Sequence, residues 1–316
     1  MLRTAVIGTG YLGRFHAQKY ARLPECQLVG VADIDEAAGQ AVAQENNTRY
    51  FQDYRKLIGL VDAISVAVPT CLHHQVASDF LEAGVHVLVE KPMTSSLDQA
   101  DDLIKLARQK QLILQIGFLE RFNRALDSIT PLITQPRFIE AHRLAGFKPR
   151  SMDINVIMDL MIHDLDIILS LINEPLVNIA ANGTKVLSDS IDIAQARLTF
   201  ANGCVANVTA SRISQKSKRK LRIFQESSCV CVDFQALKMS HFQKGSGELF
   251  PGIPNIECQE QSYDCEGDDK DALKREIKDF LACIRESRPP RVSGEGSRKV
   301  LEVACRISEI ISENKI

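Results

Sequence analysis

The sequence has no long run of basic residues, and its charges nearly balance. Its 316 residues include 38 Lys and Arg against 40 Asp and Glu, which gives a formal net charge of −2. One short basic cluster occurs at residues 216–220, and we interpret it as a solvated turn that leads into a strand. A nucleic-acid-binding domain carries a basic patch or stripe. The composition therefore predicts no nucleic-acid partner.

Long apolar stretches are also missing. No window reaches the roughly 20 residues that a membrane-spanning helix needs. The first residues, MLRTAVIGTG, lead from a short apolar run directly into glycines. A secretory signal would show a longer apolar stretch and a small-residue cleavage site. We therefore expect a cytoplasmic protein with no membrane partner.

The nine cysteines show neither an even count nor the pairing of a metal site. Cys229 and Cys231 alternate within an apolar run, so we expect their side chains on the same side of one strand. Scattered cysteines of this kind are typical of reduced thiols in a cytoplasm. The sequence thus predicts structural thiols and no bound metal.

The sequence does contain a regular alternation of strand and helix signals up to about residue 117. Short apolar runs predict strands at residues 2–7, 27–33, 61–68, 86–90 and 112–117. Helices are expected at residues 11–21, 36–44 and 71–83, and a fourth, capped by Ser95 or Ser96, extends to residue 109. Alternation of this kind predicts an α/β domain with a doubly wound parallel sheet.

Beyond residue 117 the pattern changes. Residues 155–172 are apolar enough for a buried helix, and runs rich in β-branched residues follow at 176–187, 191–200, 204–213, 220–225 and 228–234. The NG and ANG sequences among these runs are hairpin signals, so we expect a mostly antiparallel sheet. Residues 244–268 are expected to form a long surface loop, and helices are expected at 271–287 and 297–312. We predict two domains, residues 1–119 and 120–316.

The motif GTGYLG places three glycines directly after the first strand and at the start of a helix. Gly8 allows a tight turn, Gly10 lets the backbone approach a pyrophosphate, and Gly13 permits close packing of helix on strand. Tyr11 and Leu12 lie between these glycines and are expected beside the same ligand. Free N–H groups at the helix N-terminus favour phosphate binding. This context predicts a dinucleotide site.

Asp33 ends the second strand about twenty residues after the last of these glycines. A carboxylate there is placed to bind the ribose hydroxyls of the adenosine half, and the acidic neighbourhood ADIDE disfavours a 2′-phosphate. The cofactor is therefore expected to be NAD. Pro69 and Thr70 end the next strand of the sheet, and His73 follows near the start of a helix. His73 either caps this site or contacts a nicotinamide.

Glu90 ends the fourth strand, and Lys91 and Pro92 follow it, at the edge where parallel sheets bind their ligands. Pro92 stops the strand. Lys91 could lower the pKa of a substrate hydroxyl or relay its proton. The alternative interpretation is a Glu–Lys pair that stabilises the loop.

In the run VIMDLMIHDLDIILSLI, nearly every position is apolar except the ionisable Asp159, His163, Asp164 and Asp166. Spacings of four and three residues put Asp159, His163 and Asp166 in one stripe of an α-helix, whereas Asp164 points about 100° away from His163. Ionisable groups are seldom buried without partners. The stripe therefore faces either a structural Asp–His network or a polar cleft in which His163 acts as a base.

Together these features resemble the Gfo/Idh/MocA family of oxidoreductases over essentially the whole chain. The motifs that carry the resemblance are GTGYLG, Asp33, VPTCLH, VLVEKP, GFLERFN and DLMIHDLD. The resemblance implies an N-terminal Rossmann domain and a C-terminal α/β domain with a large, mostly antiparallel sheet that commonly mediates dimers or tetramers. It also implies oxidation or reduction of a hydroxyl of a sugar, cyclitol or related compound with a nicotinamide cofactor.

The resemblance assigns Lys91 to the family's E-K-P motif, and Asp159 and His163 to its D-x-x-x-H pair. His163 is then the acid/base, Lys91 lies close to the reacting hydroxyl, and Asp159 supports the network. His73 matches a histidine that commonly lies near the nicotinamide. Asp166 matches an acidic position that binds substrate hydroxyls.

Arg121 and Asn123 match positions that reach nicotinamide or substrate. The chain departs from the family pattern at Arg124, where many members have Pro, and at residues 152–159, which lack the usual glycines. We interpret Arg124 as a surface residue. The entrance to the site is expected to differ from that of many members.

The pairing of GFLERFN with DLMIHDLDIIL is similar to a branch that includes UDP-N-acetylglucosamine 3-dehydrogenases. These make a 3-keto nucleotide sugar for an aminotransferase in lipid A or surface-glycan synthesis. Under this hypothesis Arg121, Arg143 and Lys148 are candidates for binding a diphosphate. The alternatives are a dehydrogenase of another sugar, an inositol or a dihydrodiol, and a regulatory protein that binds NAD but turns nothing over.

Overall fold

The structure is a computed structural model, and it describes residues 1–147, 154–262 and 271–313. The chain forms two compact units, the first made of Met1–Phe122 and Asp271–Leu301 and the second of Asn123–Lys270 and Glu302–Ile316. The sequence predicted two continuous domains, whereas each unit combines two separate segments. The reason is helix α7 (Ala272–Glu286), whose Ile277 and Phe280 are fully buried in a core shared with β1 and α1.

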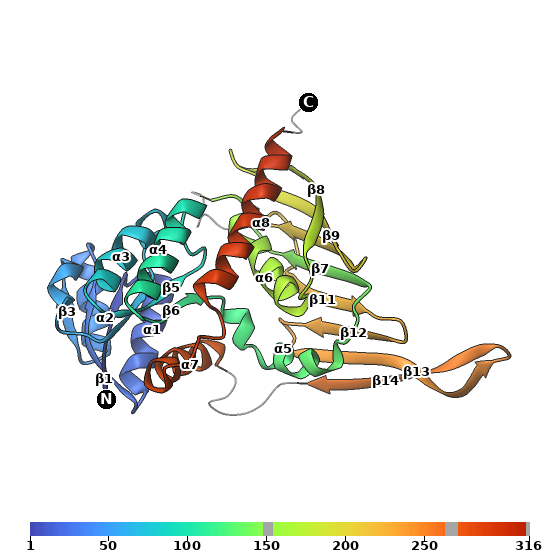
Figure 1. Ribbon diagram of the computed structural model, residues 1–316, viewed down its shortest axis with the longest axis horizontal. Helices are drawn as coiled ribbons and strands as arrows, with labels where there is room; N and C mark the ends of the chain where they lie inside the picture. Colours follow the sequence, from blue (N-terminus) through green and yellow to red (C-terminus); the bar gives the residue numbers. More distant parts are fainter. Residues whose placement is uncertain (148–153, 263–270, 314–316) are drawn as a thin grey trace. The chain divides into compact units, whose positions relative to one another are not determined.

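The first unit contains a six-stranded parallel sheet with the strand order β3-β2-β1-β4-β5-β6 (Figure 1). The strands are β1 (Leu2–Ile7), β2 (Cys26–Ala32), β3 (Arg49–Phe51), β4 (Ala63–Val66), β5 (His86–Glu90) and β6 (Leu114–Gly117). The predicted parallel sheet is confirmed, and β3 is an addition too short to show a pattern. The order reverses between β1 and β4, and in open α/β sheets ligands bind outside the carboxyl ends of the strands at such a point.

The helices of the first unit follow the predicted rhythm. They are α1 (Tyr11–Arg22), α2 (Glu36–Glu45), α3 (His73–Glu82), α4 (Leu97–Gln109) and α7, with short 3₁₀ turns at Tyr54–Leu57, Thr70–Leu72 and Leu119–Phe122. Ser96 is the N-cap of α4, because its side chain accepts from the backbone N–H of Gln99. Helix α8 (Gly294–Glu313) begins in this unit and ends in the other.

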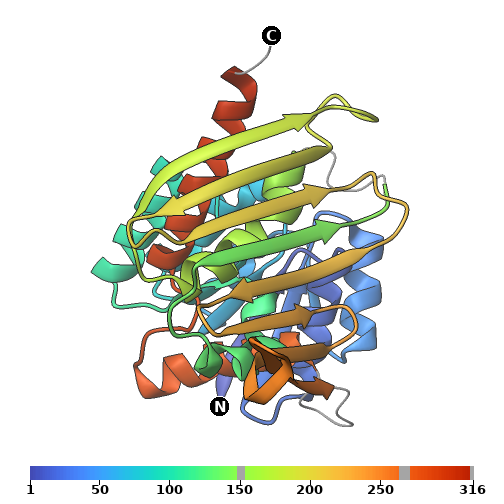
Figure 2. The same ribbon diagram turned by 90° about the vertical axis from the view of Figure 1, so that its right-hand side faces the viewer.

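The second unit contains an eight-stranded sheet with the order β14-β13-β12-β11-β7-β10-β9-β8. Its strands are β7 (Phe138–Leu144), β8 (Leu176–Thr184), β9 (Ile193–Phe200), β10 (Val205–Ser211), β11 (Lys218–Phe224), β12 (Ser228–Asp233), β13 (Lys238–Phe250) and β14 (Ile253–Ser262). Only β7 and β10 pair in parallel, so the mostly antiparallel prediction is confirmed. The helices of this unit, α5 (Arg124–Ile129), α6 (Ile162–Leu171) and the end of α8, lie on one face, and the other face is open in the described part of the unit (Figure 2).

Two local predictions for this unit were wrong. The loop expected at residues 244–268 is largely the hairpin of β13 and β14, whose turn contains Gly252 with a φ of 77°, while residues 263–268 lie outside the described part. The glycines and prolines of this segment sit at bulges and at the turn, and most of its side chains are exposed. The segment therefore lacks the apolar alternation from which a strand is predicted. Asn182 and Gly183 lie inside β8 rather than in a turn. The predicted turn at residues 201–203 is confirmed by the pairing of β9 with β10.

No helix in the described residues has the length and apolar character needed to cross a membrane.

Candidate active site

The glycine turn after β1 leaves room for a ligand at one position only. Gly8 has a φ of 91°, and a Cβ there would lie 2.6 Å from the carbonyl oxygen of Ala67. A Cβ on Gly13 would lie 1.8 Å from the carbonyl oxygen of Gly8. Apart from its chain neighbours, no atom of the described residues lies within 4 Å of a Cβ on Gly10. Gly8 and Gly13 therefore serve the backbone, whereas Gly10 borders open space at the N-terminus of α1, where a phosphate can approach.

Asp33 follows β2 and is hydrogen-bonded to the glycine turn. Its Oδ2 accepts from the N–H of Thr9 at 2.6 Å and from the Thr9 hydroxyl at 2.8 Å, and its Oδ1 accepts from the N–H of Asp35 at 2.9 Å. Ile34 directly follows Asp33 in the chain and is 87% exposed, and Tyr11, the first residue of α1, is 72% exposed. Ile34 was not identified from the sequence, although an apolar residue within ADIDE is a detectable signal. If Asp33 binds the ribose as predicted, an exposed apolar side chain next to its carboxylate suits the face of an adenine.

His73 lies in the interior rather than open to a ligand. It is 1% exposed; its Nδ1 lies 2.9 Å from the carbonyl oxygen of Pro92 and its Nε2 2.9 Å from that of Val68. Burial lowers the pKa of His73, and the two backbone contacts act in the opposite direction. The ring thus joins the loop after β4, where Pro69 and Thr70 lie, to the loop after β5.

Lys91 follows β5 directly and is half-buried at the carboxyl edge of the parallel sheet. The Lys91–Pro92 peptide bond is cis. Glu90, the last residue of β5, is 8% exposed, and its Oε1 lies 2.8 Å from Nε2 of His16. The E-K-P motif thus has a buried glutamate followed by a half-buried lysine.

In the second unit, the predicted catalytic helix has two parts. A π-helical turn spans Ile157–Met161, and α6 continues from Ile162. The π turn interrupts the regular 3.6-residue period on which the predicted stripe depends, and such turns are frequent at functional sites. Asp159 and His163 are half-buried, whereas Asp166 is only 3% exposed. The candidate acid/base pair is therefore the more accessible part of the stripe.

A buried ion pair holds this helix against β7. The Nε and Nη2 atoms of Arg143 lie 3.0 and 2.9 Å from the two carboxylate oxygens of Asp164, and both side chains are 4% exposed. This geometry is bidentate. The proposed role of Arg143 in binding a diphosphate is therefore wrong, because its guanidinium is buried against Asp164. Lys148, the other candidate from this segment, lies outside the described residues.

A second buried ion pair holds the chain just before the helix. Asp192 accepts from the backbone N–H groups of Val186 and Leu187 and from Nε of Arg212 at 2.8 Å, while Nη1 of Arg212 donates to the carbonyl oxygen of Ile154 at 3.0 Å. Burial tends to raise the pKa of Asp192, but its hydrogen bonds and the guanidinium outweigh this, and the net pKa lies well below its usual range.

The predicted site residues are divided between the two units. The first carries the glycine turn, Asp33, His73, Lys91 and Arg121, and the second carries Asn123, Asp159, His163 and Asp166. Arg121 is half-buried in the turn that ends at Phe122. Asn123 has a local role, since its Oδ1 accepts from the N–H of Ala125 at 3.0 Å and caps α5.

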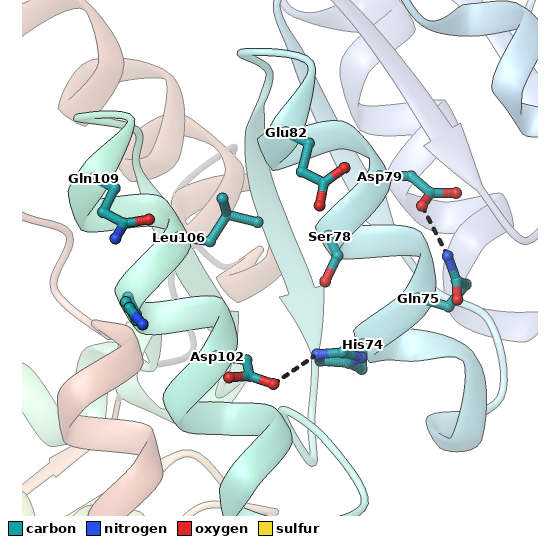
Figure 3. A pocket seen from close by; sticks show the side chains of 9 residues that line it. His74, Gln75, Ser78, Asp79, Glu82, Asp102, Leu106 and Gln109 are labelled. Atoms are coloured by element: carbon teal, nitrogen blue, oxygen red, sulfur yellow. Dashed lines mark hydrogen bonds and ion pairs between the residues drawn. The ribbon is translucent and has the colours of Figure 1, made fainter.

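A separate polar groove lies between α3 and α4 (Figure 3). His74 points across it to Asp102, with Nε2 3.7 Å from a carboxylate oxygen, and Gln75 donates to Asp79 at 2.8 Å. None of the predicted site residues lines this groove.

Comparison with known proteins agrees with this arrangement. Residues 2–118 match a family described as "Oxidoreductase family, NAD-binding Rossmann fold", and residues 135–228 match the "GFO/IDH/MocA C-terminal domain". The chain is 42% identical over 307 residues to a UDP-N-acetylglucosamine 3-dehydrogenase of Acidithiobacillus ferrooxidans, covering 97% of this chain and 96% of that protein.

Solved structures extend the comparison. The structure of the A. ferrooxidans UDP-N-acetylglucosamine 3-dehydrogenase GnnA superposes with a TM-score of 0.92 at 41% identity, covering 99% of this chain and 98% of that one. A levoglucosan dehydrogenase in complex with NADH and levoglucosan shares the fold, with a TM-score of 0.87 at 17% identity and coverage of 99% and 97%. The chain belongs to the Gfo/Idh/MocA family of oxidoreductases.

Proposed function

We propose that the protein is an NAD-dependent dehydrogenase that oxidises the C-3 hydroxyl of UDP-N-acetylglucosamine to a ketone. The observation that carries this proposal is the 42% identity, over nearly the full length of both chains, to a protein of that activity. The dinucleotide turn and the residues Lys91, Asp159 and His163 support it, since they supply the cofactor site and the proton chemistry that the reaction needs.

Oxidation of an alcohol removes a hydride from carbon and a proton from oxygen. When bound, the nicotinamide supplies the hydride acceptor. In the proposal His163 accepts the hydroxyl proton, and the Lys91 ammonium stabilises negative charge that builds on the oxygen. Asp159 orients His163 and stabilises its imidazolium. Asp166, Arg121 and Asn123 are the proposed substrate contacts.

The cofactor preference follows from charge near the ribose. Asp33 lies in the sequence ADIDE with Asp35 and Glu36, and a 2′-phosphate placed there would face carboxylates. We therefore expect kcat/KM for NAD to exceed that for NADP by at least about tenfold, or about 1.4 kcal/mol. Steady-state kinetics with both cofactors at one ionic strength measures this. A preference for NADP would contradict the assignment of Asp33.

The product suggests a partner reaction. A 3-keto sugar can be converted to a 3-amino sugar by an aminotransferase, which removes the ketone and draws the oxidation forward. We propose such an enzyme as the next step, and a homodimer or homotetramer formed through the open sheet face as the assembly.

The direct test incubates purified protein with NAD and UDP-N-acetylglucosamine, with and without an aminotransferase and glutamate, and analyses products by mass spectrometry. The expected product is a nucleotide sugar lighter by two hydrogens, or its 3-amino derivative. The His163→Ala variant is expected to lose turnover while it still binds NAD. Failure of the wild-type protein to convert any UDP-sugar would refute the proposed substrate, and inositols and free sugars would then be assayed in its place.

A further inference from the structure

A buried polar cluster lies beneath the edge of the sheet that carries Lys91. His16, on α1, is fully buried, with Nε2 2.8 Å from Oε1 of Glu90 and Nδ1 3.0 Å from the hydroxyl of Ser65. The hydroxyl of Tyr20 lies 2.9 Å from the same Ser65 oxygen. Burial raises the pKa of Tyr20, which keeps its phenol neutral. The cluster therefore links α1, β4 and the end of β5 through side chains that are fully buried except for Glu90, whose side chain is 11% exposed.

The backbone makes room for this carboxylate. Glu90 pairs with Gly117 of β6, and a Cβ on Gly117 would lie 2.9 Å from Oε2 of Glu90. Glu276 of α7 is also fully buried, and its carboxylate lies within 4.8 Å of the ring of His16 and the carboxylate of Glu90. Burying charges is expensive unless they are paired. Because burying these charged groups does not stabilise the fold, we look for their role in holding neighbouring residues in position.

A second buried histidine holds the other side of Lys91. As described above, the ring of His73 spans the carbonyl oxygens of Val68 and Pro92, each at 2.9 Å. Glu90, just before Lys91, is thus held by His16 through its carboxylate. Pro92, just after Lys91, is held by His73 through its carbonyl oxygen. Burial lowers the pKa of His73, and the charge of Glu90 acts in the opposite direction, so the two contacts are electrostatically connected.

We propose that His16 and His73 are positioning residues that fix Lys91 from both sides, with Glu90 as the link to His16. This rests on the proposed role of Lys91 in the reaction. Because α1 begins at the glycine turn, the link through His16 also places the lysine relative to the pyrophosphate-binding backbone. A misplacement of about 1 Å can cost roughly 100-fold in rate. The network therefore acts on kcat through Lys91 rather than on cofactor binding.

A double-mutant cycle tests the inference. Glu90→Gln keeps the shape of the side chain but removes its charge, and Gly117→Ala displaces the carboxylate without removing any charge. His73→Gln tests the other contact. Each is measured alone and combined with Lys91→Ala, with kcat on UDP-N-acetylglucosamine and the Kd of NADH by fluorescence as readouts. Gly296→Ala is the control, since its Cβ would meet only the Ser293 hydroxyl, at 3.7 Å.

In the wild-type background we expect each substitution to lower kcat by about tenfold or more while the Kd of NADH changes by less than about threefold. In the Lys91→Ala background the same substitutions are expected to change the remaining kcat by less than about threefold. Gly296→Ala is expected to leave both quantities unchanged.

Equal losses in both backgrounds, or an NADH affinity that falls as much as kcat, would overturn the inference and make the cluster purely structural. A metal ion found in the purified protein by elemental analysis and lost on Glu90→Gln would also overturn it, because His16 would then be a metal ligand. Full activity of Lys91→Ala alone would instead refute the role of Lys91 in the proposed function. Gly117→Ala keeps the test decisive if Glu90→Gln does not fold.

Discussion

The three glycines of the turn after β1 differ in what a methyl group would meet. A Cβ on Gly13 would overlap the carbonyl oxygen of Gly8 at 1.8 Å, whereas a Cβ on Gly10 would have no atom of the described residues within 4 Å beyond its chain neighbours. Gly13→Ala is therefore expected to destabilise the fold by several kcal/mol. Gly10→Ala is expected to leave the melting temperature within about 2 °C of wild type and to weaken NADH binding at least about tenfold, because its methyl group would occupy the proposed pyrophosphate position.

Differential scanning calorimetry and NADH fluorescence titration distinguish the two variants. An unchanged NADH affinity in Gly10→Ala would contradict the placement of the pyrophosphate at this turn.

At the residue scale, the roles of the glycines could be predicted from the sequence, because only glycine fits where two backbone segments approach closely. The sequence could not reveal the surroundings of His73, because both partners of its ring are backbone carbonyl oxygens, which any residue supplies.

At the scale of elements, the chain that precedes the π turn and α6 depends on the pair Asp192–Arg212. Asp192→Asn would leave the guanidinium of Arg212, which is 5% exposed, without its buried countercharge. We expect a loss of about 3 kcal/mol in the free energy of unfolding at neutral pH. Asp101→Asn, which removes an exposed pair with Arg298, is the control and is expected to cost less than about 1 kcal/mol.

The pH dependence of this loss has a definite sign. The folded-state pKa of Asp192 lies below its unfolded value of about 3.9, so its contribution is fully present above that pH and is lost as the pH falls through the folded value. Urea unfolding from pH 3 to pH 8 should show a constant difference between wild type and Asp192→Asn above about pH 5, and a smaller one below pH 4. A difference that grows on acidification would contradict the depressed pKa.

Elements with a strong period could be predicted, and those without one could not. The parallel strands and the paired runs of β9 and β10 are short apolar segments between turns, so their pattern is local. The hairpin of β13 and β14 is exposed on both faces for most of its length, which removes the alternation on which a strand prediction relies. The π turn at Ile157–Met161 leaves no mark in the spacing of apolar residues.

At the scale of the whole molecule, the sequence predicted two domains but not how the chain divides between them. Helix α7 has a strongly one-sided apolar pattern, and this shows that it packs on a core without showing which core. Its Phe280 and Leu281 belong to the cluster that contains Val6 and Tyr20 of the first unit. Which unit a terminal helix joins is a long-range property, and a single sequence carries no local signal for it.

The open face of the eight-stranded sheet is where the proposed self-association can be tested. On this face Arg222 is exposed, donates to Glu140 at 2.9 Å and lies 4.8 Å from the ring centre of Phe224, which in turn is 5.7 Å from Phe138. Half-buried aromatic rings with a charged rim resemble the centre of a protein interface. Arg222→Glu would place two carboxylates side by side there.

We therefore expect Arg222→Glu to shift the mass measured by light scattering after size exclusion from a dimer or tetramer toward the monomer. Arg306→Glu is the matched control, because Arg306 is an exposed residue of α8, among the helices that cover the other face of the sheet, and its charge reversal should leave the mass unchanged. A wild-type protein that stays monomeric at micromolar concentration, or an Arg222→Glu variant with the wild-type mass, would show that the open face does not form the interface.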